Sequence, residues 1–197
     1  MKETKILPLR IGVGAIVLNE NNFVFVGKRK DNPINKWQMP QGGVDKNENF
    51  INAMKRELFE ETSIKSIKIL KEIEGTFEYE LPKNLLGIIW KGKYRGQKQK
   101  WFIVKFIGNE SEVNLKTRHP EFIEWKWIPV DELPEVIVDF KKEVYLKLLK
   151  EIKSLPGCPP LFVKIAPDLS FKDIDEICQL ISDEKINGII ATNTSLN

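Results

Sequence analysis

Three glutamates in the first third of the chain have a spacing that suits metal ions. Glu57, Glu60 and Glu61 stand at positions i, i+3 and i+4, so a helix would place their carboxylates on one face. Like charges on one face repel each other, and a helix that needs only solubility usually alternates them with lysine. Mg²⁺ relieves this repulsion, because it prefers oxygen ligands and completes its shell with water and substrate phosphates. The spacing therefore suits a magnesium site, but a solvated acidic face is the usual explanation for a glutamate-rich helix, and the neighbouring residues must decide between them.

The residues before these glutamates supply a turn and a positive charge. Gly42 and Gly43 can form a turn ahead of the helix, and Arg56 can bond a carboxylate through the fork of its guanidinium. The stretch GGVDKNENFINAMKRELFEETSI resembles the Nudix box, a loop–helix–loop that binds metal and diphosphate. Its matching residues are Gly42, Glu48, Arg56, Glu57, Leu58, Glu60, Glu61 and Ile64. One position departs from the pattern: Ser63 replaces a glycine, so the turn that ends the helix must accept a side chain.

The resemblance to the Nudix box, together with that to one branch of the family described below, implies a role for each residue of the expected site. The metal would be Mg²⁺, with Mn²⁺ as an alternative, and its ligands would be Glu57, Glu60, Glu61, Glu121 and Gly42. The catalytic residues would be Glu57, Glu61 and Arg56, with either glutamate as the base that activates water. The residues that contact the 5′ phosphates or the first nucleotides would be Arg10, Gln41, Tyr79 and Lys141. Cations suit that contact because they neutralise a polyphosphate.

Four further segments narrow the resemblance to one branch of the family. They are WQMPQGG at 37–43, GQKQKWF at 96–102, PEF at 120–122 and FKKEVY at 140–145. Each resembles the bacterial RNA pyrophosphohydrolases, which are close to the asymmetrical dinucleoside tetraphosphate hydrolases. The resemblance implies removal of pyrophosphate from 5′-triphosphorylated RNA, which promotes mRNA decay. The alternatives are hydrolysis of diadenosine tetraphosphate and, from another class, an inactive domain that only binds nucleotide or RNA.

Several residues of interest also have a purely structural interpretation. Arg10 and Lys141 would on composition alone be solvated surface cations, and Tyr79 lies among charges at an expected loop edge. The only histidine, His119, is predicted to be a loop residue, because metal–carboxylate chemistry needs no imidazole. Core packing is the expected role of four tryptophans, Trp37, Trp101, Trp125 and Trp127.

Composition narrows the class of protein only broadly. The chain has 197 residues, of which 42% are hydrophobic and 30% charged, as is ordinary for a globular protein. Its net charge of +3 fits an anionic substrate better than a cationic one. The two cysteines, Cys158 and Cys178, are expected to pack in a reducing cytoplasm. No run approaches the roughly 18 apolar residues of a spanning helix, so we expect no membrane partner, and the oligomeric state is open.

The pattern along the chain predicts an α+β fold. Residues 11–18 and 23–27 are expected to form a hairpin, and residues 48–62 the helix that carries the glutamates. Further strands are expected within 66–80 and at 86–90. After a polar stretch at 91–100, strands are expected at 101–107 and 122–128, and a helix over 138–153. The resemblance adds the Nudix arrangement, an α/β/α sandwich around a mixed sheet.

The C-terminal part of the chain has a different sequence pattern from the rest. The sequence LPGCPP at 155–160 predicts a boundary, which gives a Nudix domain at 1–154 and a separate tail at 155–197. The tail has the pattern of one βαβ unit and resembles a fragment of dihydroorotate dehydrogenase, in which Lys164 and Asn193 would match flavin contacts. A complete barrel needs roughly 200 residues or more. We therefore expect a remnant that binds no flavin, and reject a flavin oxidoreductase; whether the tail folds is left open.

Overall fold

The computed structural model describes residues 7–30, 36–118 and 120–155, and in the C-terminal part residues 162–165, 170, 174–175, 177–179 and 188–191. The chain divides into two compact units, Met1–Ile152 and Lys153–Asn197. Each unit is described by itself below. The domain assignment made from sequence, with its dehydrogenase-like tail, stays a prediction.

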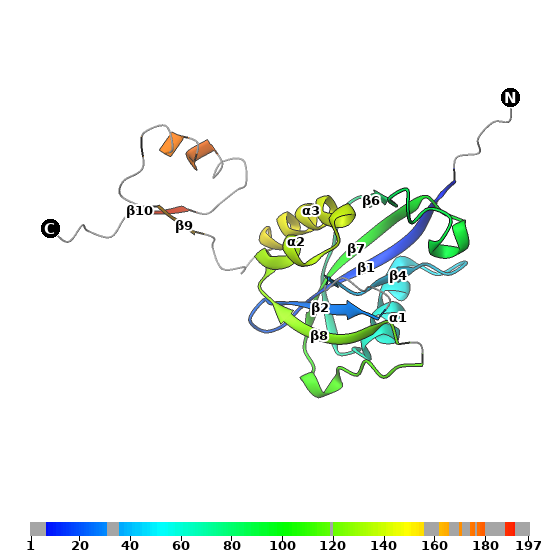
Figure 1. The fold of residues 1–197 in the computed structure, drawn as a ribbon. Helices are drawn as coiled ribbons and strands as arrows, with labels where there is room; N and C mark the ends of the chain where they lie inside the picture. The colour runs from blue at the N-terminus through cyan, green and yellow to red at the C-terminus, as the bar shows by residue number, and fades with distance from the viewer. Residues whose placement is uncertain are drawn as a thin grey trace, which may run out of the picture. The chain divides into compact units, whose positions relative to one another are not determined.

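The first unit is built on an eight-stranded mixed sheet, with β1 at its centre (Figure 1). Strand β1 pairs in parallel with β7 along its whole length, whereas β2 and β4 pair with β1 in the antiparallel direction. The strands are β1 (Leu9–Leu18), β2 (Val24–Arg29), β3 (Trp37–Gln38), β4 (Gln41–Gly43), β5 (Ile67–Glu72), β6 (Phe77–Glu80), β7 (Gly96–Phe106) and β8 (Phe122–Ile128).

Two long helices cover the sheet, α1 (Phe50–Thr62) on one face and α3 (Lys142–Lys153) on the other (Figure 1). Alternate residues of a strand face opposite sides, and β7 shows this directly. Phe102 packs in the cluster under α1, while Trp101 lies edge-on to Tyr145 of α3. The shorter helices are α2 (Leu133–Val136) and the 3₁₀ turns η1 (Ile89–Gly92), η2 (Glu110–Glu112), η3 (Val130–Glu132) and η4 (Asp139–Lys141). The α+β sandwich predicted from sequence is thus confirmed.

Helix α1 is held by a cap at its start and by an apolar stripe on one side. The side chain of Asn49 accepts a hydrogen bond from the backbone N–H of Asn52 at 2.8 Å, as an N-cap residue does. Ala53, Met54 and Leu58 are fully buried against the sheet. The step of four from Met54 to Leu58 gives one apolar stripe. Glu57 and Glu60 are not among the buried residues of the helix, whereas Glu61 is.

Ser63 ends α1 in the left-handed conformation, with φ of 65°. A side chain costs about 1 kcal/mol or more in this region, whereas glycine adopts it readily. The Ser63 hydroxyl recovers part of this cost by donating to the carbonyl oxygen of Asn114 at 3.0 Å. The departure from the family pattern at this position is therefore accommodated by strain at the end of the helix.

We expect Ser63→Gly to raise the free energy of unfolding by about 0.5–1 kcal/mol. The glycine relieves the strained backbone, and the gain exceeds the loss of one exposed hydrogen bond. Ser63→Ala is the matched control, since it loses the hydroxyl but keeps the strain, and it should destabilise the protein slightly. Urea denaturation of both variants measures the difference. A glycine variant no more stable than the alanine variant would contradict this account.

Most elements expected from sequence are confirmed, including the β1–β2 hairpin and the strand at 122–128. The strand expected at 86–90 is wrong: Gly87 and Gly92 have positive φ, as do Trp90 and Lys91, and the segment forms the turn η1. The polar stretch expected to reach Lys100 is also wrong in part, because β7 begins at Gly96. Two of its polar residues, Gln97 and Gln99, are buried in this strand and contact the site described below.

The second unit contains two parallel strands, β9 (Phe162–Ile165) and β10 (Gly188–Ala191), with helical residues at 174–175 and 177–179 between them. This order agrees with the expected βαβ pattern. Cys178 is an exposed free thiol, so its predicted packing role is wrong. Cys158, the prolines of the expected boundary at 156–160 and Asn193 lie outside the described residues. In the part of the chain that the structure describes, no helix is both long and apolar enough to cross a membrane.

Candidate active site

Arg56 is the centre of the hydrogen bonds that fix the turn before α1 to the helix. Its Nε and one terminal nitrogen donate to the two carboxylate oxygens of Glu48 at 2.9 and 2.8 Å. The same terminal nitrogen donates to the carbonyl oxygen of Gly43 at 2.9 Å, and the other donates to Glu57 at 2.9 Å and Glu60 at 3.1 Å. One guanidinium therefore sets the position of three carboxylates and of the glycine turn.

The charges in this arrangement reinforce one another. The Arg56 guanidinium, with the backbone N–H of Asp45, lowers the pKa of the Glu48 carboxyl to about 2. The Glu48 carboxylate in turn raises the pKa of Arg56 above its ordinary value. Both shifts favour the ionised forms near neutral pH. The pair is thus an ion pair that joins α1 to the loop before it. Glu48 is therefore not available for acid–base chemistry.

Glu57 lies directly against Gly42, and this contact explains the glycine. A side chain at Gly42 would overlap the Glu57 carboxyl group. Burial raises the pKa of Glu57, and this effect outweighs the opposing hydrogen bond from Arg56. The carbonyl oxygen of Gly42 faces the side-chain amide of Gln97 at the long distance of 3.5 Å. Gly42 therefore contacts Glu57 through its Cα, while its carbonyl oxygen faces Gln97; the prediction that both residues bind the metal stays a prediction.

Glu61 is the most unusual residue of the site, because its side chain is buried with only 2% exposed. One carboxylate oxygen accepts the backbone N–H of Gln41 at 3.0 Å, but the other is buried with no donor among the described residues. Burial raises the pKa of Glu61 well above its usual range, and repulsion from Glu121 and Glu57 raises it further. A buried, half-satisfied carboxylate is costly. It points to a ligand that completes its coordination.

The position of the glutamates on α1 adds to this cost. Glu60 and Glu61 lie in the last turn of the helix, which carries no basic residue. The C-terminal end of a helix is the negative end of its dipole, where acidic side chains are destabilising. The local sequence thus destabilises the end of the helix. A bound cation would offset both the helix dipole and the repulsion between the carboxylates.

The carboxylates line a cavity of about 560 Å³ between the second half of α1 and the loop before β8. Glu121, on that loop, pairs with Arg29 at 2.9 Å. The cavity is lined by Glu57, Phe59, Glu60, Glu61, Ser63, Thr117, Arg118 and Glu121. The structure therefore brings the four predicted metal-binding glutamates, from two distant parts of the chain, to a single cavity.

In this arrangement no group of three or more carboxylate, imidazole or thiol side chains in the described ranges is close enough together to hold a metal ion. The reason is that two arginines hold the carboxylates: Arg56 holds Glu57 and Glu60, and Arg29 holds Glu121. The donor set itself, carboxylate and carbonyl oxygens with one unpartnered oxygen on Glu61, fits a hard divalent cation. Binding would require the carboxylates to turn from the arginines towards the ion.

The residues expected to contact substrate lie on the other side of Gly42 and are more buried than expected. Lys141 is only 7% exposed and donates to the side chain of Gln38 at 3.3 Å, so its interpretation as a solvated cation is wrong. Tyr79 is also 7% exposed and lies within strand β6, not at a loop edge, with the Lys141 ammonium 5.1 Å from its ring centre. Arg10 is half-buried, packs over the Trp90 ring and reaches Gly43.

Sequence reasoning missed a row of glutamines beneath this region. The Tyr79 hydroxyl donates to Gln97 at 2.7 Å, and the Gln99 amide donates to Gln41 at 3.0 Å. The Gln41 amide donates in turn to Gln38 at 3.3 Å. A signal was present, because glutamines two apart on a strand share one face. Arg29, which holds Glu121, was also missed and had no local signal. His119 lies outside the described residues.

A mixed sheet that carries a glutamate-lined helix, tied by one arginine to a glycine turn, defines a class of enzyme that cleaves phosphoric anhydrides. Comparison with known proteins agrees. The sequence model of the NUDIX domain matches residues 8–148. The chain is 58% identical to an RNA pyrophosphohydrolase of Pelagibacter ubique (strain HTCC1062) over 156 residues, 79% of this chain and 99% of that protein. It is 44% identical to an RNA pyrophosphohydrolase of Rickettsia conorii (strain ATCC VR-613 / Malish 7), over 76% of this chain and 92% of that one.

The chain belongs to the Nudix family, and it is a hydrolase of phosphoric anhydrides. Members of this family generally use divalent metal ions. Among solved structures, the fold resembles an Ap4A hydrolase of C. elegans with a TM-score of 0.56 at 20% identity, over 75% of this chain and all of that one. It also resembles the dihydroneopterin triphosphate pyrophosphohydrolase of E. coli, with a TM-score of 0.55 at 17% identity, over 73% and 97%. These similarities confirm the fold.

Proposed function

We propose that the protein is a cytoplasmic RNA 5′-pyrophosphohydrolase, which removes pyrophosphate from 5′-triphosphorylated RNA, leaves a 5′-monophosphate and so promotes mRNA decay. The observation that carries the chemistry is Glu61, a buried carboxylate with one oxygen unpartnered at the wall of an acidic cavity. The choice of RNA as substrate is supported by the curated relatives, which are RNA pyrophosphohydrolases at 42–58% identity.

The metal in this proposal is Mg²⁺, with Mn²⁺ as an alternative. Glu57, Glu60, Glu61 and Glu121 would hold it through their carboxylates, and Gly42 through its carbonyl oxygen. When bound, such an ion neutralises charge on the phosphates and acidifies a coordinated water. Glu60 is the most exposed of the helix ligands, with 57% of its side chain accessible, so its contribution should be the smallest of the three on α1.

The protein's own residues position the reactants and move the proton. Glu57 and Glu61 are the two candidates for the base, because each lines the cavity and has a raised pKa, which makes a carboxylate a better proton acceptor near neutral pH. Arg56 does not reach the substrate in this scheme. It positions Glu57 and Glu60 through the hydrogen bonds described above.

The nucleotide end of the substrate would lie on the side of Arg10, Gln41, Tyr79 and Lys141. The Arg10 guanidinium next to Gly43 can bond phosphate oxygens in a fork. Tyr79 is too buried to offer an open face for base stacking, so we assign it the role of holding Lys141 in place. Gln41 connects the two halves of the site, since its backbone binds Glu61 and its side chain binds Gln38.

Hydrolysis of diadenosine tetraphosphate is the second candidate, and one observation favours it. Phe59 is 51% exposed and lines the cavity beside the glutamates. An exposed aromatic ring can stack on a base. The dinucleotide carries a nucleoside at each end of its phosphate chain, whereas the phosphate chain of RNA ends in a free phosphate. Side-by-side assays with the two substrates decide between them.

The test of the proposed function is product analysis with 5′-triphosphorylated RNA in the presence of Mg²⁺. We expect RNA with a 5′-monophosphate and free pyrophosphate, seen by thin-layer chromatography of end-labelled RNA. Removal of divalent ions with EDTA should abolish the reaction, and added Mg²⁺ should restore it. Cleavage of diadenosine tetraphosphate alone would overturn the RNA assignment, and turnover that is unchanged in EDTA would overturn the metal assignment.

A further inference from the structure

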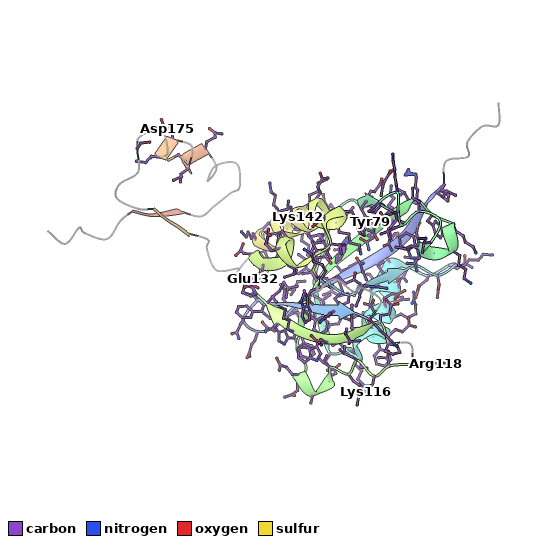
Figure 2. All side chains as sticks on the ribbon, in the orientation of Figure 1. Tyr79, Lys116, Arg118, Glu132, Lys142 and Asp175 are labelled. Atoms are coloured by element: carbon purple, nitrogen blue, oxygen red, sulfur yellow. The ribbon has the colours of Figure 1, made fainter. Side chains whose placement is uncertain are left out.

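Arg118 gives the acidic cavity a positive charge that none of the assignments above uses. It lies on the loop between β7 and β8 and is the one cation among the described residues that line the cavity, which also include four glutamates. It is exposed, and it forms no ion pair with any residue that the structure describes. Figure 2 labels it, together with Lys116 of the same loop, beneath α1 in this view. A cation in this place is available to an anionic ligand.

Thr117, the neighbour of Arg118, supplies an independent sign of a ligand. Its hydroxyl is buried at the cavity wall and has no hydrogen-bond partner among the described residues. The unpartnered oxygen of Glu61, whose side chain is more than nine-tenths buried, faces the same cavity. Buried polar groups normally have partners. One wall therefore offers a free donor and the other a free acceptor, which suits a phosphate oxygen on the first and a metal ion on the second.

We propose that Arg118 and Thr117 form the subsite for the terminal phosphates of the substrate, the group that leaves as pyrophosphate. The assignment rests on the proposed function. It follows from the direction in which the phosphate chain of the substrate would run through the site. The expected nucleotide contacts Arg10, Gln41 and Lys141 do not line this cavity. A chain of phosphates that starts there and meets the glutamates enters the cavity, which Thr117 and Arg118 also line.

The chemistry of the leaving group needs a cation at this end. The oxygen of water forms a bond to the α phosphorus, the bond from that phosphorus to the bridging oxygen breaks, and pyrophosphate departs with the electron pair while the proton goes to the glutamate base. Negative charge therefore builds up on the departing phosphates. Arg118 can bond two of their oxygens in a fork, and the Thr117 hydroxyl can donate to a third.

The experiment compares Arg118→Gln with Lys116→Gln, an exposed lysine of the same loop that does not line the cavity. Each variant removes one positive charge, so any general attraction of anionic RNA changes equally in both. Inorganic pyrophosphate is titrated against the Mg²⁺-loaded full-length protein by calorimetry. We expect Arg118→Gln to weaken pyrophosphate binding by about 10-fold, the effect of one charge-assisted contact, and Lys116→Gln to leave it within about twofold.

A second readout is the preference between RNA ends. Arg118→Gln should lower kcat/KM for 5′-triphosphorylated RNA more than for 5′-diphosphorylated RNA, which has a shorter leaving group. Thr117→Val should weaken pyrophosphate binding without lowering Tm, because it removes a buried hydroxyl that bonds nothing in the described structure. An equal loss on both RNA ends would mean that Arg118 binds the RNA chain, and would overturn the subsite. A Tm loss for Thr117→Val would show a structural hydroxyl.

The two proposals fail in different ways. If the wild-type protein cleaves no RNA but its pyrophosphate binding still depends on Arg118, the proposed function is wrong and the subsite stands. If the wild-type protein cleaves RNA as expected and Arg118→Gln binds pyrophosphate like Lys116→Gln, the subsite is wrong and the function stands.

Discussion

Glu61→Gln should lower kcat on 5′-triphosphorylated RNA by about 10²–10⁴-fold, the usual effect of losing a general base or a charge that acts in the transition state. RNA affinity should change little, because the metal and the base do their main work in the transition state. The same substitution should keep or raise Tm. It replaces a buried carboxylate, half of whose hydrogen-bonding capacity is unused, with a neutral amide of equal size.

This opposite effect on activity and stability separates a functional residue from a structural one. Single-turnover rates and thermal denaturation of the same preparation measure it. Glu132→Gln, an exposed glutamate outside the carboxylate face, is the control and should alter neither quantity. Near-normal turnover of Glu61→Gln would remove this residue from the mechanism, and a large fall in Tm would mean that its charge is structural.

Arg56→Lys should lower the free energy of unfolding by about 2 kcal/mol, since bonds to charged groups in a half-buried site are lost. Lysine cannot replace the planar fork, which bonds Glu48 through two nitrogens and still reaches Gly43 and Glu57. We also expect kcat to fall by about 10–100-fold, because positioning groups around a metal have effects of this size. Urea denaturation and steady-state kinetics, both at a temperature where the variant is folded, give the two quantities.

Arg95→Lys is the matched control for this prediction. Arg95 pairs with a single exposed carboxylate, that of Glu80, at 2.7 Å. Exposed pairs of this kind contribute about 0–1 kcal/mol. If the two variants lose equal stability, Arg56 does not organise the turn and the helix as described. If Arg56→Lys loses stability but keeps full activity, its positioning of Glu57 has no catalytic role.

Features encoded locally could be predicted from the sequence. The helix α1 follows from its cap and apolar stripe, and the face shared by Glu57, Glu60 and Glu61 follows from their spacing alone. The prediction that Arg56 binds a carboxylate through its fork is also confirmed, with Glu48 as that partner. Each of these features depends on residues close together in the chain.

Features that depend on pairing between distant segments could not be predicted. The burial of Lys141 and its contact with Gln38 join segments about a hundred residues apart. The Arg29–Glu121 pair depends on the register of β2 with β8, which no local pattern specifies. The burial of Glu61 depends in the same way on the position of Gln41 in β4. Spacing identified Glu61, and the family resemblance identified Gln41, Glu121 and Lys141, as part of a site. Only the fold shows which of them are buried and which residues hold them.

The most direct test of the carboxylate face is anomalous diffraction from crystals of the wild-type protein soaked in Mn²⁺. The account predicts a peak within bonding distance of Glu61 and Glu57, with the Glu57 carboxylate turned from Arg56 towards the ion. Crystals with Mn²⁺ bound elsewhere but none at α1, and with one Glu61 oxygen still without a partner, would contradict it.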